Sequence, residues 1–425
     1  MEELVICGGK RLTGAIRVDS AKNAVLPIMA ASVMAGEPVV IRKTPDITDA
    51  ASMAEILRTL GCDVRRQGSD LHIDSGPIHN WEMPDALSKQ IRSSIFLLGP
   101  ILARFGRATV TYPGGCEIGL RPIDLHLSGL RRLGVHIREE GGQIFCDGSN
   151  MHPGEIHFDY PSVGATENAM MAAVLLDGTT FIHNAAREPE IADLQRFINA
   201  MGGRVEGAGG QTICVRGVKK LHGTQWTPIP DRIVAGTLLA AAAITGGEVT
   251  LEHVYPEDLV AVTAKLREMG CTVSEDARMC RMMLTAPPRL TAFSMLQTQP
   301  HPGFPTDMQV QMLTLLASAE GTGVIVENVF ENRFTHAGDL NRMGAHILST
   351  GRSAVVRGAA DLYGAEVTAR DLRGGAALVL AGLRARGETH VAHAELIDRG
   401  YDHIERQLRQ LGADIRRVHH DERRS

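Results

Sequence analysis

Apolar and polar positions along the chain follow two helical patterns separated by short β-branched strands. One kind of helix is apolar on nearly every face, as in Met170–Leu176 and Leu238–Ile244. The other kind is apolar on one face only, as in Ile191–Met201. A helix without a polar face is normally buried, whereas an amphipathic helix borders a core. The pattern therefore predicts helices inside the molecule and half-exposed sheets outside, the reverse of a usual α/β barrel.

This pattern repeats six times along the chain. Each amphipathic helix ends at a Leu-Gly or Met-Gly pair, whose glycines are Gly61, Gly134, Gly202, Gly270, Gly344 and Gly412. The intervals between these glycines are 73, 68, 68, 74 and 68 residues, which indicates an internal repeat. A second glycine closes each apolar helix before a strand, at Gly36, Gly106, Gly178, Gly246, Gly321 and Gly387. Glycine at these places predicts left-handed helix caps.

Six units of helix–strand–helix–strand–strand predict an α/β protein with two domains of three units each. Two prolines in Thr227–Arg232 favour an extended connector, and we place the seam there. We expect a discontinuous domain of residues 1–20 and 231–425 and a second domain of residues 21–230. The opening segment Leu4–Val18 is interpreted as a hairpin that completes the last unit.

Composition and charge narrow the class of protein. The chain has 425 residues, of which 44% are hydrophobic and 22% charged, as in ordinary globular proteins. A formal charge of −5 argues against a nucleic-acid-binding protein. The longest apolar run, Ile233–Ile244, is shorter than the ~20 residues of a membrane span, and no signal peptide is evident. We expect a cytoplasmic protein without nucleic-acid or membrane partners.

The seven cysteines and the histidines lack the spacing of a metal site. The cysteines are odd in number and form no CxxC pair, which argues against zinc and against a disulfide framework. We expect no metal and no cofactor.

Cys116 lies in the segment that we favour for chemistry. Pro113–Gly119 reads P-G-G-C-E-I-G, and glycines on both sides of the thiol allow the backbone to approach or cover a ligand. Arg121 follows closely. A buried cysteine beside an ordinary turn is the alternative, and only the rest of the chain decides between the two.

Several polar residues recur at the start of an apolar helix or just after a strand. Before helices these are Lys22, Asn23, Arg92, Ser162, Val163, Gly164, Asp231, Arg232, Asp307 and Arg373, and after strands they include Arg333 and Arg399. Helix N-termini attract anions, so the set predicts a site for a substrate that carries phosphate and carboxylate groups. The neighbours Pro302, Phe304 and Pro305 predict an apolar setting for Asp307, which would raise its pKa and suit it to proton transfer.

The motifs together resemble the enolpyruvyl transferases, and among them those that use UDP-N-acetylglucosamine. The resemblance covers the whole chain and rests on eight runs in order. They are A-K-N-A at Ala21–Ala24, P-G-G-C-E-I-G-L-R-P-I-D-L-H at Pro113–His126, S-V-G-A-T-E at Ser162–Glu167, N-A-A-R-E-P-E-I from Asn184, P-G-F-P-T-D-M-Q from Pro302, F-E-N-R-F from Phe330, D-L-R from Asp371 and D-R-G-Y from Asp398. It implies a two-domain inside-out α/β barrel, with the opening hairpin in the second domain.

The resemblance also implies a reaction. The enolpyruvyl group of phosphoenolpyruvate would pass to the 3-hydroxyl of UDP-N-acetylglucosamine with release of phosphate, the first committed step of peptidoglycan precursor synthesis and so of cell wall biogenesis and cell division. Cys116 would act as the general acid and could carry a pyruvate adduct. Asp307 would act as the base. Lys22 and Arg399 would complete the catalytic set.

Substrate contacts are implied in the same way. Lys22, Arg92, Arg121, Arg373 and Arg399 would bind phosphate and carboxylate, and Asn23 the tetrahedral centre, while residues 113–119 would close as a lid. The nucleotide sugar would be held by Arg121, Pro122, Ile123, Asp124, Leu125, Ser162, Val163, Gly164, Asp307 and Val329. Tyr160 stands where some members have a lysine, which leaves one diphosphate contact in doubt.

Three other functions stay open from the sequence. A shikimate-using enolpyruvyl transferase shares the barrel, but the cysteine-bearing segment and the S-V-G-A-T-E run argue against it. A catalytically silent regulatory paralogue is disfavoured because Lys22, Cys116, Asp307 and Arg399 are all present. A phosphate-binding module without turnover would not need the thiol. We also expect the epoxide fosfomycin to alkylate Cys116. The oligomeric state is not readable.

Overall fold

The chain divides into two compact units. The computed structural model describes residues 2–89, 91–112, 123–358 and 361–419. Within these residues, the amino-terminal unit contains residues 20–112 and 123–229, and the carboxy-terminal unit contains residues 2–19 and 230–419. Each unit contains three of the six repeats.

The amino-terminal unit contains its elements in the repeated order. They are α1 (Lys22–Ala31), η1 (Ser32–Met34), β3 (Pro38–Ile41), α2 (Thr48–Leu60), β4 (Asp63–Gln67), β5 (Asp70–Asp74), α3 (Asp85–Ser88), η2 (Arg92–Leu97), α4 (Leu98–Phe105), β6 (Arg107–Thr111), α5 (Asp124–Arg132), β7 (His136–Glu140), β8 (Gln143–Asp147), β9 (Glu155–His157), α6 (Val163–Ala173), β10 (Thr179–His183), α7 (Pro189–Ala200), β11 (Arg204–Glu206), β12 (Thr212–Arg216) and β13 (Gln225–Trp226).

The carboxy-terminal unit begins with the first two strands of the chain and continues after residue 229. Its elements are β1 (Glu2–Cys7), β2 (Thr13–Arg17), α8 (Arg232–Thr245), β14 (Glu248–Glu252), η3 (Pro256–Leu259), α9 (Val260–Glu268), β15 (Thr272–Asp276), β16 (Arg281–Thr285), β17 (Met295–Gln297), η4 (Thr306–Met308), α10 (Gln309–Ser318), β18 (Thr322–Val326), α11 (Ala337–Arg342), β19 (His346–Thr350), β20 (Ser353–Arg357), β21 (Glu366–Thr368), α12 (Leu372–Arg384), β22 (Glu388–Ala392), η5 (Ala394–Arg399), α13 (Ile404–Gln410) and β23 (Asp414–His419).

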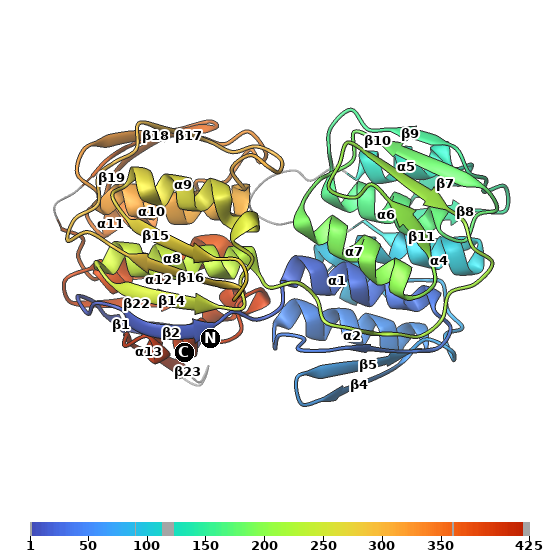
Figure 1. Cartoon of the computed structure of the whole chain (residues 1–425), viewed down its shortest axis with the longest axis horizontal. Coiled ribbons are helices and arrows are strands. Elements are labelled where there is room, and N and C mark those ends of the chain that lie inside the picture. Colours follow the sequence, from blue (N-terminus) through green and yellow to red (C-terminus); the bar gives the residue numbers. More distant parts are fainter. Residues whose placement is uncertain (1, 90, 113–122, 359–360, 420–425) are drawn as a thin grey trace. The chain divides into compact units, whose positions relative to one another are not determined.

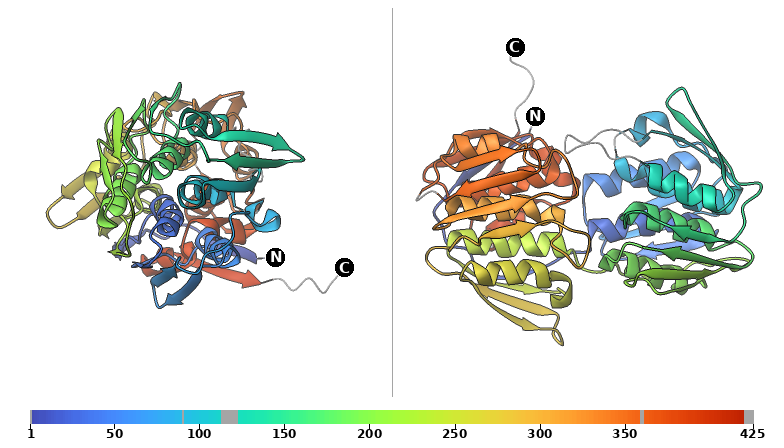
Figure 2. Two further views of the ribbon diagram at one scale, coloured as in Figure 1. Left: turned by 90° about the vertical axis from the view of Figure 1, so that its right-hand side faces the viewer. Right: turned by 90° about the horizontal axis from the view of Figure 1, so that it is seen from above.

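Helices fill the inside of each unit and sheets lie outside them, as predicted (Figures 1 and 2). Every residue of α8 and of α10 is buried, and so are most residues of α1, α6 and α12. Strands such as β14 alternate between buried and more exposed residues, because one face packs on the helices and the other faces solvent. In the part of the chain that the structure describes, no helix is both long and apolar enough to cross a membrane.

Six sheets are formed by the described residues, one for each repeat. The order in one of them, β17-β18-β20-β19, shows the shared plan: two antiparallel pairs and one short strand parallel to the first strand of the repeat. The sheet β6-β8-β7 has three strands, and a single parallel bridge between Glu82 and Thr109 stands where the fourth strand lies in the other sheets.

The opening segment is not a hairpin, so this prediction was wrong. β1 pairs with β22 and β23 of the sixth repeat, whereas β2 pairs in parallel with β14 of the fourth. The reason is that both sheets lack a strand of their own. β1 takes the third place in the order β21-β22-β1-β23, where β20 lies in β17-β18-β20-β19, because the chain supplies only β22 and β23 after α12. The expectation that the opening segment completes the last repeat is confirmed for β1.

The repeated glycines have the predicted backbone conformation. All six glycines that follow the amphipathic helices have positive φ, between 85° at Gly134 and 107° at Gly61. The six that precede the first strands also have positive φ, for example 65° at Gly106 and at Gly246. Gly178, Gly321 and Gly387, however, lie two or more residues beyond the ends of α6, α10 and α12, so the prediction of helix caps was wrong for these three. Glycine adopts this left-handed conformation without the steric cost that a Cβ atom adds, which explains its recurrence at these positions.

Candidate active site

Three buried helices of the carboxy-terminal unit start at the same end. The side chain of Gln311 lies 2.9 Å from the hydroxyl of Thr237, which links the first turn of α10 to the second turn of α8. The hydroxyl of Thr314 lies 3.5 Å from the carbonyl of Ala377, which links α10 and α12 at matching depths. The three helices therefore run parallel, and their positive ends share one side of the unit.

Asp307 lies at this end between two buried arginines. Arg333 Nη2 lies 2.8 Å from Asp307 Oδ1, and Arg373 Nη2 lies 3.1 Å from Oδ2. The arginine side chains are only 2% and 4% exposed, and that of Asp307 is 26% exposed. Two guanidinium groups stabilise the ionised carboxylate. The apolar setting predicted from the neighbouring prolines is therefore not what surrounds this carboxylate.

Arg373 is fixed by the start of α12. Asp371 caps this helix and accepts hydrogen bonds from the amides of Arg373 and Gly374, each 3.0 Å long. Burial alone would lower the pKa of Arg373, but the charge of Asp307, then Tyr401 and Asp231, raises it above its usual value. Its Nε and Nη1 have no hydrogen-bond partner among the described residues. Two buried donors are therefore available to an anion.

Val329 belongs to a turn that is tied to the Asp307 segment. Glu327 is fully buried and accepts hydrogen bonds from the amides of Val329 and Phe330, at 2.8 and 3.1 Å. Its other oxygen accepts from Thr306, the residue before Asp307, at 3.0 Å. One carboxylate thus fixes both the turn with Val329 and the helix η4 with Asp307.

Arg399 lies at the end of η5, next to a second ionic cluster. Its neighbour Asp398 accepts two hydrogen bonds from Arg417, at 2.6 and 2.8 Å, and Arg417 also pairs with Glu405 at 2.9 Å and with Glu2 at 2.5 Å. The ring of Tyr401 lies 5.4 Å from the guanidinium carbon of Arg373. The segment that carries Arg399 is therefore adjacent to Arg373.

Oxygen and nitrogen atoms of Asp398, His403 and Glu405 lie within 4.8 Å of one another, as in some metal sites. The guanidinium group of Arg417 already pairs with both carboxylates. The donor set is thus satisfied by a cation of the protein.

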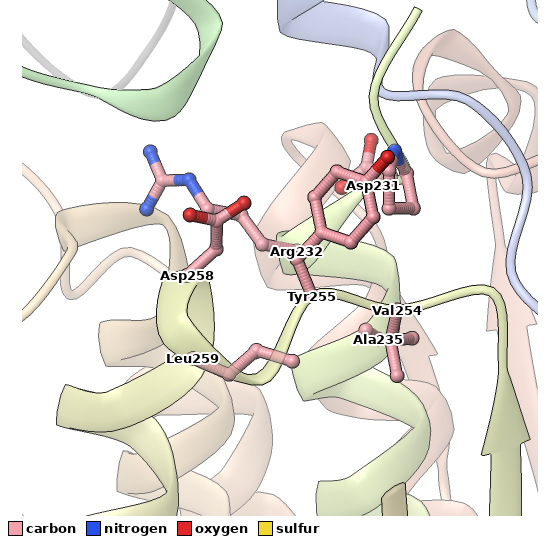
Figure 3. Close-up of a pocket in the computed structure, with 8 residues that line it drawn as sticks. Asp231, Arg232, Ala235, Val254, Tyr255, Asp258 and Leu259 are labelled. Atoms are coloured by element: carbon pink, nitrogen blue, oxygen red, sulfur yellow. The ribbon is translucent and has the colours of Figure 1, made fainter. Parts of the chain in front are cut away.

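A shallow pocket lies beside the start of α8 (Figure 3). Asp231 caps α8 by accepting from the amides of Ile233 and Val234, at 2.8 and 2.9 Å. The side chains of Arg232 and Asp258 extend toward the same open space in Figure 3, and Tyr255 and Asp231 also line the pocket. This end of the helices therefore presents both signs of charge.

Lys22 is the first residue of α1 in the amino-terminal unit. Its Nζ lies 2.7 Å from Asp49 Oδ2 of α2, with side-chain exposures of 11% and 4%. Asn23 follows it and is half-buried. A nearly buried ammonium group at a helix start is suited to bind an anion.

Three other predicted segments meet at His126. Gly164, in the first turn of α6, lies so close to the His126 ring that a Cβ atom would be 2.8 Å from it. Asn168 of α6 lies 2.8 Å from His126 Nδ1. Burial and then the charge of Arg92 lower the pKa of His126 to about 3, so the ring is neutral at pH 7. Arg92 of η2, the start of α5 and the start of α6 are thus neighbours.

The remaining predicted residues at this place have the following positions. Ile123 is buried before α5, Asp124 is exposed at its first position and Leu125 is half-buried. Ser162 caps α6 by accepting from the amide of Ala165 at 3.4 Å, and Val163 begins the helix. The predictions for Cys116, Arg121, Pro122 and the loop 113–119 fall on residues that lie outside the described ones.

Sequence reasoning did not assign Asp49 or Glu327 to the site, whereas it placed Arg333 among the polar residues that follow strands. Glu327 and Arg333 have a sequence signal, because both follow the first strand of a repeat. Asp49 has none, since an acidic residue in the first turn of an amphipathic helix is common for helix stability alone.

Comparison with known proteins gives one consistent result. The family model of EPSP synthase (3-phosphoshikimate 1-carboxyvinyltransferase) matches residues 6–408. The chain is 50% identical over 418 residues to UDP-N-acetylglucosamine 1-carboxyvinyltransferase 2 of Caldanaerobacter subterraneus subsp. tengcongensis, covering 98% of this chain and 100% of that protein. It is 52% identical over 423 residues to UDP-N-acetylglucosamine 1-carboxyvinyltransferase 1 of Symbiobacterium thermophilum, covering 98% and 95%.

Solved structures agree in fold. The enolpyruvyl transferase NikO from Streptomyces tendae is 27% identical with a TM-score of 0.88, covering 98% of this chain and 99% of that one. EPSP synthase from Acinetobacter baumannii is 18% identical with a TM-score of 0.75, covering 99% and 100%. The inside-out α/β fold expected from the repeat is the fold of these proteins.

Proposed function

Because the chain belongs to the EPSP synthase family of enolpyruvyl transferases, we propose that it transfers the enolpyruvyl group of phosphoenolpyruvate to the 3-hydroxyl of UDP-N-acetylglucosamine. The observation that carries this proposal is the identity of 47–52% over 98% of the chain to proteins named for that reaction. In this function the protein starts peptidoglycan precursor synthesis in the cytoplasm and supports cell wall biogenesis, cell shape and cell division.

The chemistry follows from the residues in named roles. The thiol of Cys116 protonates the methylene carbon of phosphoenolpyruvate, and the adjacent carbon becomes electrophilic. A thiol with a pKa near ~8.5 keeps its proton at neutral pH and can serve as this acid. The sugar hydroxyl attacks that carbon and gives its proton to the Asp307 carboxylate. The tetrahedral intermediate then expels phosphate, and its methyl group returns a proton to the Cys116 thiolate. This step forms the enol ether product and regenerates the thiol.

The binding roles are supported by charge and burial. Arg373 has two buried donors without a partner among the described residues, and Lys22 stands at a helix start. Arg92, Arg121 and Arg399 add positive charge for phosphate and carboxylate. Asn23 is assigned to the tetrahedral centre, and residues 121–125, Ser162, Val163, Gly164, Asp307 and Val329 to the nucleotide sugar. Tyr160, which is 42% exposed, stands where some members have a lysine, so this position supplies no cationic contact to the diphosphate.

The proposed roles divide between two domains. Residues 21–230 supply Lys22, Arg92 and the loop 113–119 with Cys116, which acts as a lid. Residues 1–20 and 231–425 supply Asp307, Arg373 and Arg399. The reaction needs no metal and no other cofactor.

A turnover assay with paired acceptors tests the function. Phosphate release from phosphoenolpyruvate should require UDP-N-acetylglucosamine and should not occur with shikimate 3-phosphate. The opposite preference would support the shikimate-using alternative, and no release with either acceptor would support a silent paralogue.

A cysteine variant tests the assigned acid. Cys116→Ala should lose turnover by about 100-fold or more, because general acid catalysis contributes that much. Intact-mass analysis after fosfomycin treatment should show one adduct on the native chain and none on Cys116→Ala. An adduct on another cysteine would contradict this assignment.

A further inference from the structure

Tyr401 has no role in the reaction described so far, yet it contacts three buried helices at the end where Asp307 lies. Its side chain is almost fully buried. Its hydroxyl lies 2.9 Å from that of Thr237 in α8 and 3.3 Å from the side-chain amide of Gln311 in α10. Its ring lies 5.4 Å from the guanidinium carbon of Arg373 in α12. One phenol therefore joins the first two turns of all three helices.

Gln311 connects this phenol to the backbone of Asp307. The amide satisfies both of its ends when its oxygen faces the hydroxyls of Tyr401 and Thr237, at 3.3 and 2.9 Å. Its nitrogen then donates to the carbonyls of Asp307 and Met308, at 3.0 and 3.3 Å. A buried amide that lacked these partners would be costly, which fixes this orientation. Arginines hold the carboxylate of Asp307, and this amide holds its carbonyl.

Resting on the proposed function, we infer that Tyr401 and Gln311 are positioning residues for the base. With Thr237 they form one buried hydrogen-bond network, which sets the place of the Asp307 backbone while touching no reacting atom. Each hydrogen bond of such a network has a preferred length and direction, so the network fixes a geometry more sharply than apolar contacts do. Sharp placement matters for catalysis, because a shift of about 1 Å in a reacting group can cost about 100-fold in rate.

The network also reaches the segment that carries Arg399. Arg399 lies two residues before Tyr401, and the amide of Tyr401 donates to the carbonyl of Ile397 in η5 at 3.1 Å. The side chain of Ile397 packs on α12, because a Cβ atom added to Gly375 would lie 2.7 Å from it. The phenol therefore cannot move without moving the turn that follows Arg399.

A buried tyrosine hydroxyl needs a hydrogen-bond partner for stability alone, so a loss of stability would not reveal a positioning role. Thr314 offers a matched control. It lies one turn after Gln311 in α10, is fully buried, and contacts the carbonyls of Val310 and Ala377, at 3.1 and 3.5 Å. Thr314→Val thus removes a buried hydroxyl from the same helices without removing any group of the network.

The test compares Tyr401→Phe with Thr314→Val, by melting temperature and by steady-state rates with phosphoenolpyruvate and UDP-N-acetylglucosamine. Each variant loses one buried hydroxyl, so both melting temperatures should fall by about 3 °C. For Tyr401→Phe we expect kcat to fall about 10-fold and the KM values to change about threefold or less, because the ring stays against Arg373 while Asp307 is less well placed. Thr314→Val should keep the native kcat.

Gln311→Met tests whether the two positioning residues act together. Methionine has a similar volume but donates nothing to the Asp307 carbonyl, so kcat should fall about 30-fold. Adding Tyr401→Phe to this variant should cost no further rate, because the phenol acts through the amide. Losses that multiply in the double variant would overturn the inference. If Tyr401→Phe does not fold, Gln311→Met decides, since full kcat in that variant overturns it.

Three other outcomes are distinguishable. A purely structural role would lower the melting temperature of Tyr401→Phe as in Thr314→Val and leave kcat unchanged, which would overturn the inference. An increase in KM at unchanged kcat would mean that the phenol serves binding, and this too would overturn it. Absence of turnover in the native chain would refute the proposed function instead.

Discussion

Two ionic clusters in the carboxy-terminal unit differ in the number of guanidinium groups per carboxylate. At Asp307 one carboxylate is shared by two guanidinium groups, whereas at Arg417 one guanidinium serves Asp398, Glu405 and Glu2. The first cluster leaves Arg333 Nε and both Nε and Nη1 of Arg373 without partners among the described residues. The second is acid-rich and joins β23, which carries Arg417, to η5, α13 and β1.

The difference indicates that the Asp307 cluster binds a ligand, whereas the Arg417 cluster stabilises the fold. An excess of buried donors is costly unless an anion completes it, so the Asp307 cluster is suited to bind substrate. The Arg417 cluster uses one cation to hold a strand, a helix and the η5 segment together, and its carboxylates repel an anionic ligand. Variants of the first cluster should therefore change turnover, and variants of the second should change stability.

Asp307→Asn should have the largest effect. The amide keeps the shape of the side chain but accepts no proton, so kcat should fall about 1000-fold while binding of UDP-N-acetylglucosamine persists. Rate measurements beside calorimetric titration of the nucleotide sugar check both halves. Undiminished turnover would show that Asp307 is not the base and that the Asp307 cluster does not serve the reaction.

Arg417→Met should come next, as a loss of stability. Removing the guanidinium leaves three carboxylates together, and breaking such a pair costs roughly 2–4 kcal/mol here because Glu2 is 33% exposed. Thermal unfolding should shift down by about 5–10 °C. A variant with the melting temperature of the native protein would show that the cluster does not stabilise the fold.

Glu167→Gln tests a buried acid that has no partner among the described residues, unlike the paired acids of the two clusters. Glu167 is fully buried, both carboxylate oxygens are unsatisfied, and burial, then Glu190 and Glu188, raise its pKa well above 4.5. The folded state therefore retains a proton that the unfolded state loses above pH 4.5, so this group destabilises the fold increasingly as pH rises toward its folded pKa.

Because glutamine cannot ionise, the melting temperature of Glu167→Gln relative to native protein should rise by about 3 °C per pH unit above that point. Thermal scans from acidic to alkaline pH give this slope. A difference that is constant with pH would mean that Glu167 is ionised in the fold.

Arg416→Met should have the smallest effect. Arg416 neighbours Arg417 on β23 but is 57% exposed and pairs with Glu388 at 3.4 Å. Exposed pairs contribute at most about 1 kcal/mol, so the melting temperature should hardly change. If this variant unfolded as early as Arg417→Met, burial of the cluster would not be the cause of the larger effect.

Repeats and helix ends were accessible to sequence reasoning because each has a local cause. A glycine such as Gly61 or Gly412 is required wherever the backbone turns left-handed after a helix, so its spacing revealed the six repeats. Lys22, Arg92, Asp307 and Arg373 could be selected because they start apolar helices. Their assigned roles in the reaction stay predictions.

Non-local contacts were not accessible in this way. Nothing near Thr13 or Arg17 in the sequence indicates that β2 pairs with β14, more than 200 residues away, because strand pairing depends on which sheet has an open edge. The same holds for Asp307, whose prolines suggested apolar surroundings while Arg333 and Arg373 approach from later segments.

The place of β1 between β22 and β23 has a consequence for biosynthesis. The amino-terminal unit is complete once residue 229 has left the ribosome, and it can fold while translation continues. β1, which is made before the whole amino-terminal unit, must instead wait until β22 and β23 emerge and pair with it. The carboxy-terminal unit therefore folds after synthesis, and its exposed leading strand is the segment for which a chaperone would be of most use.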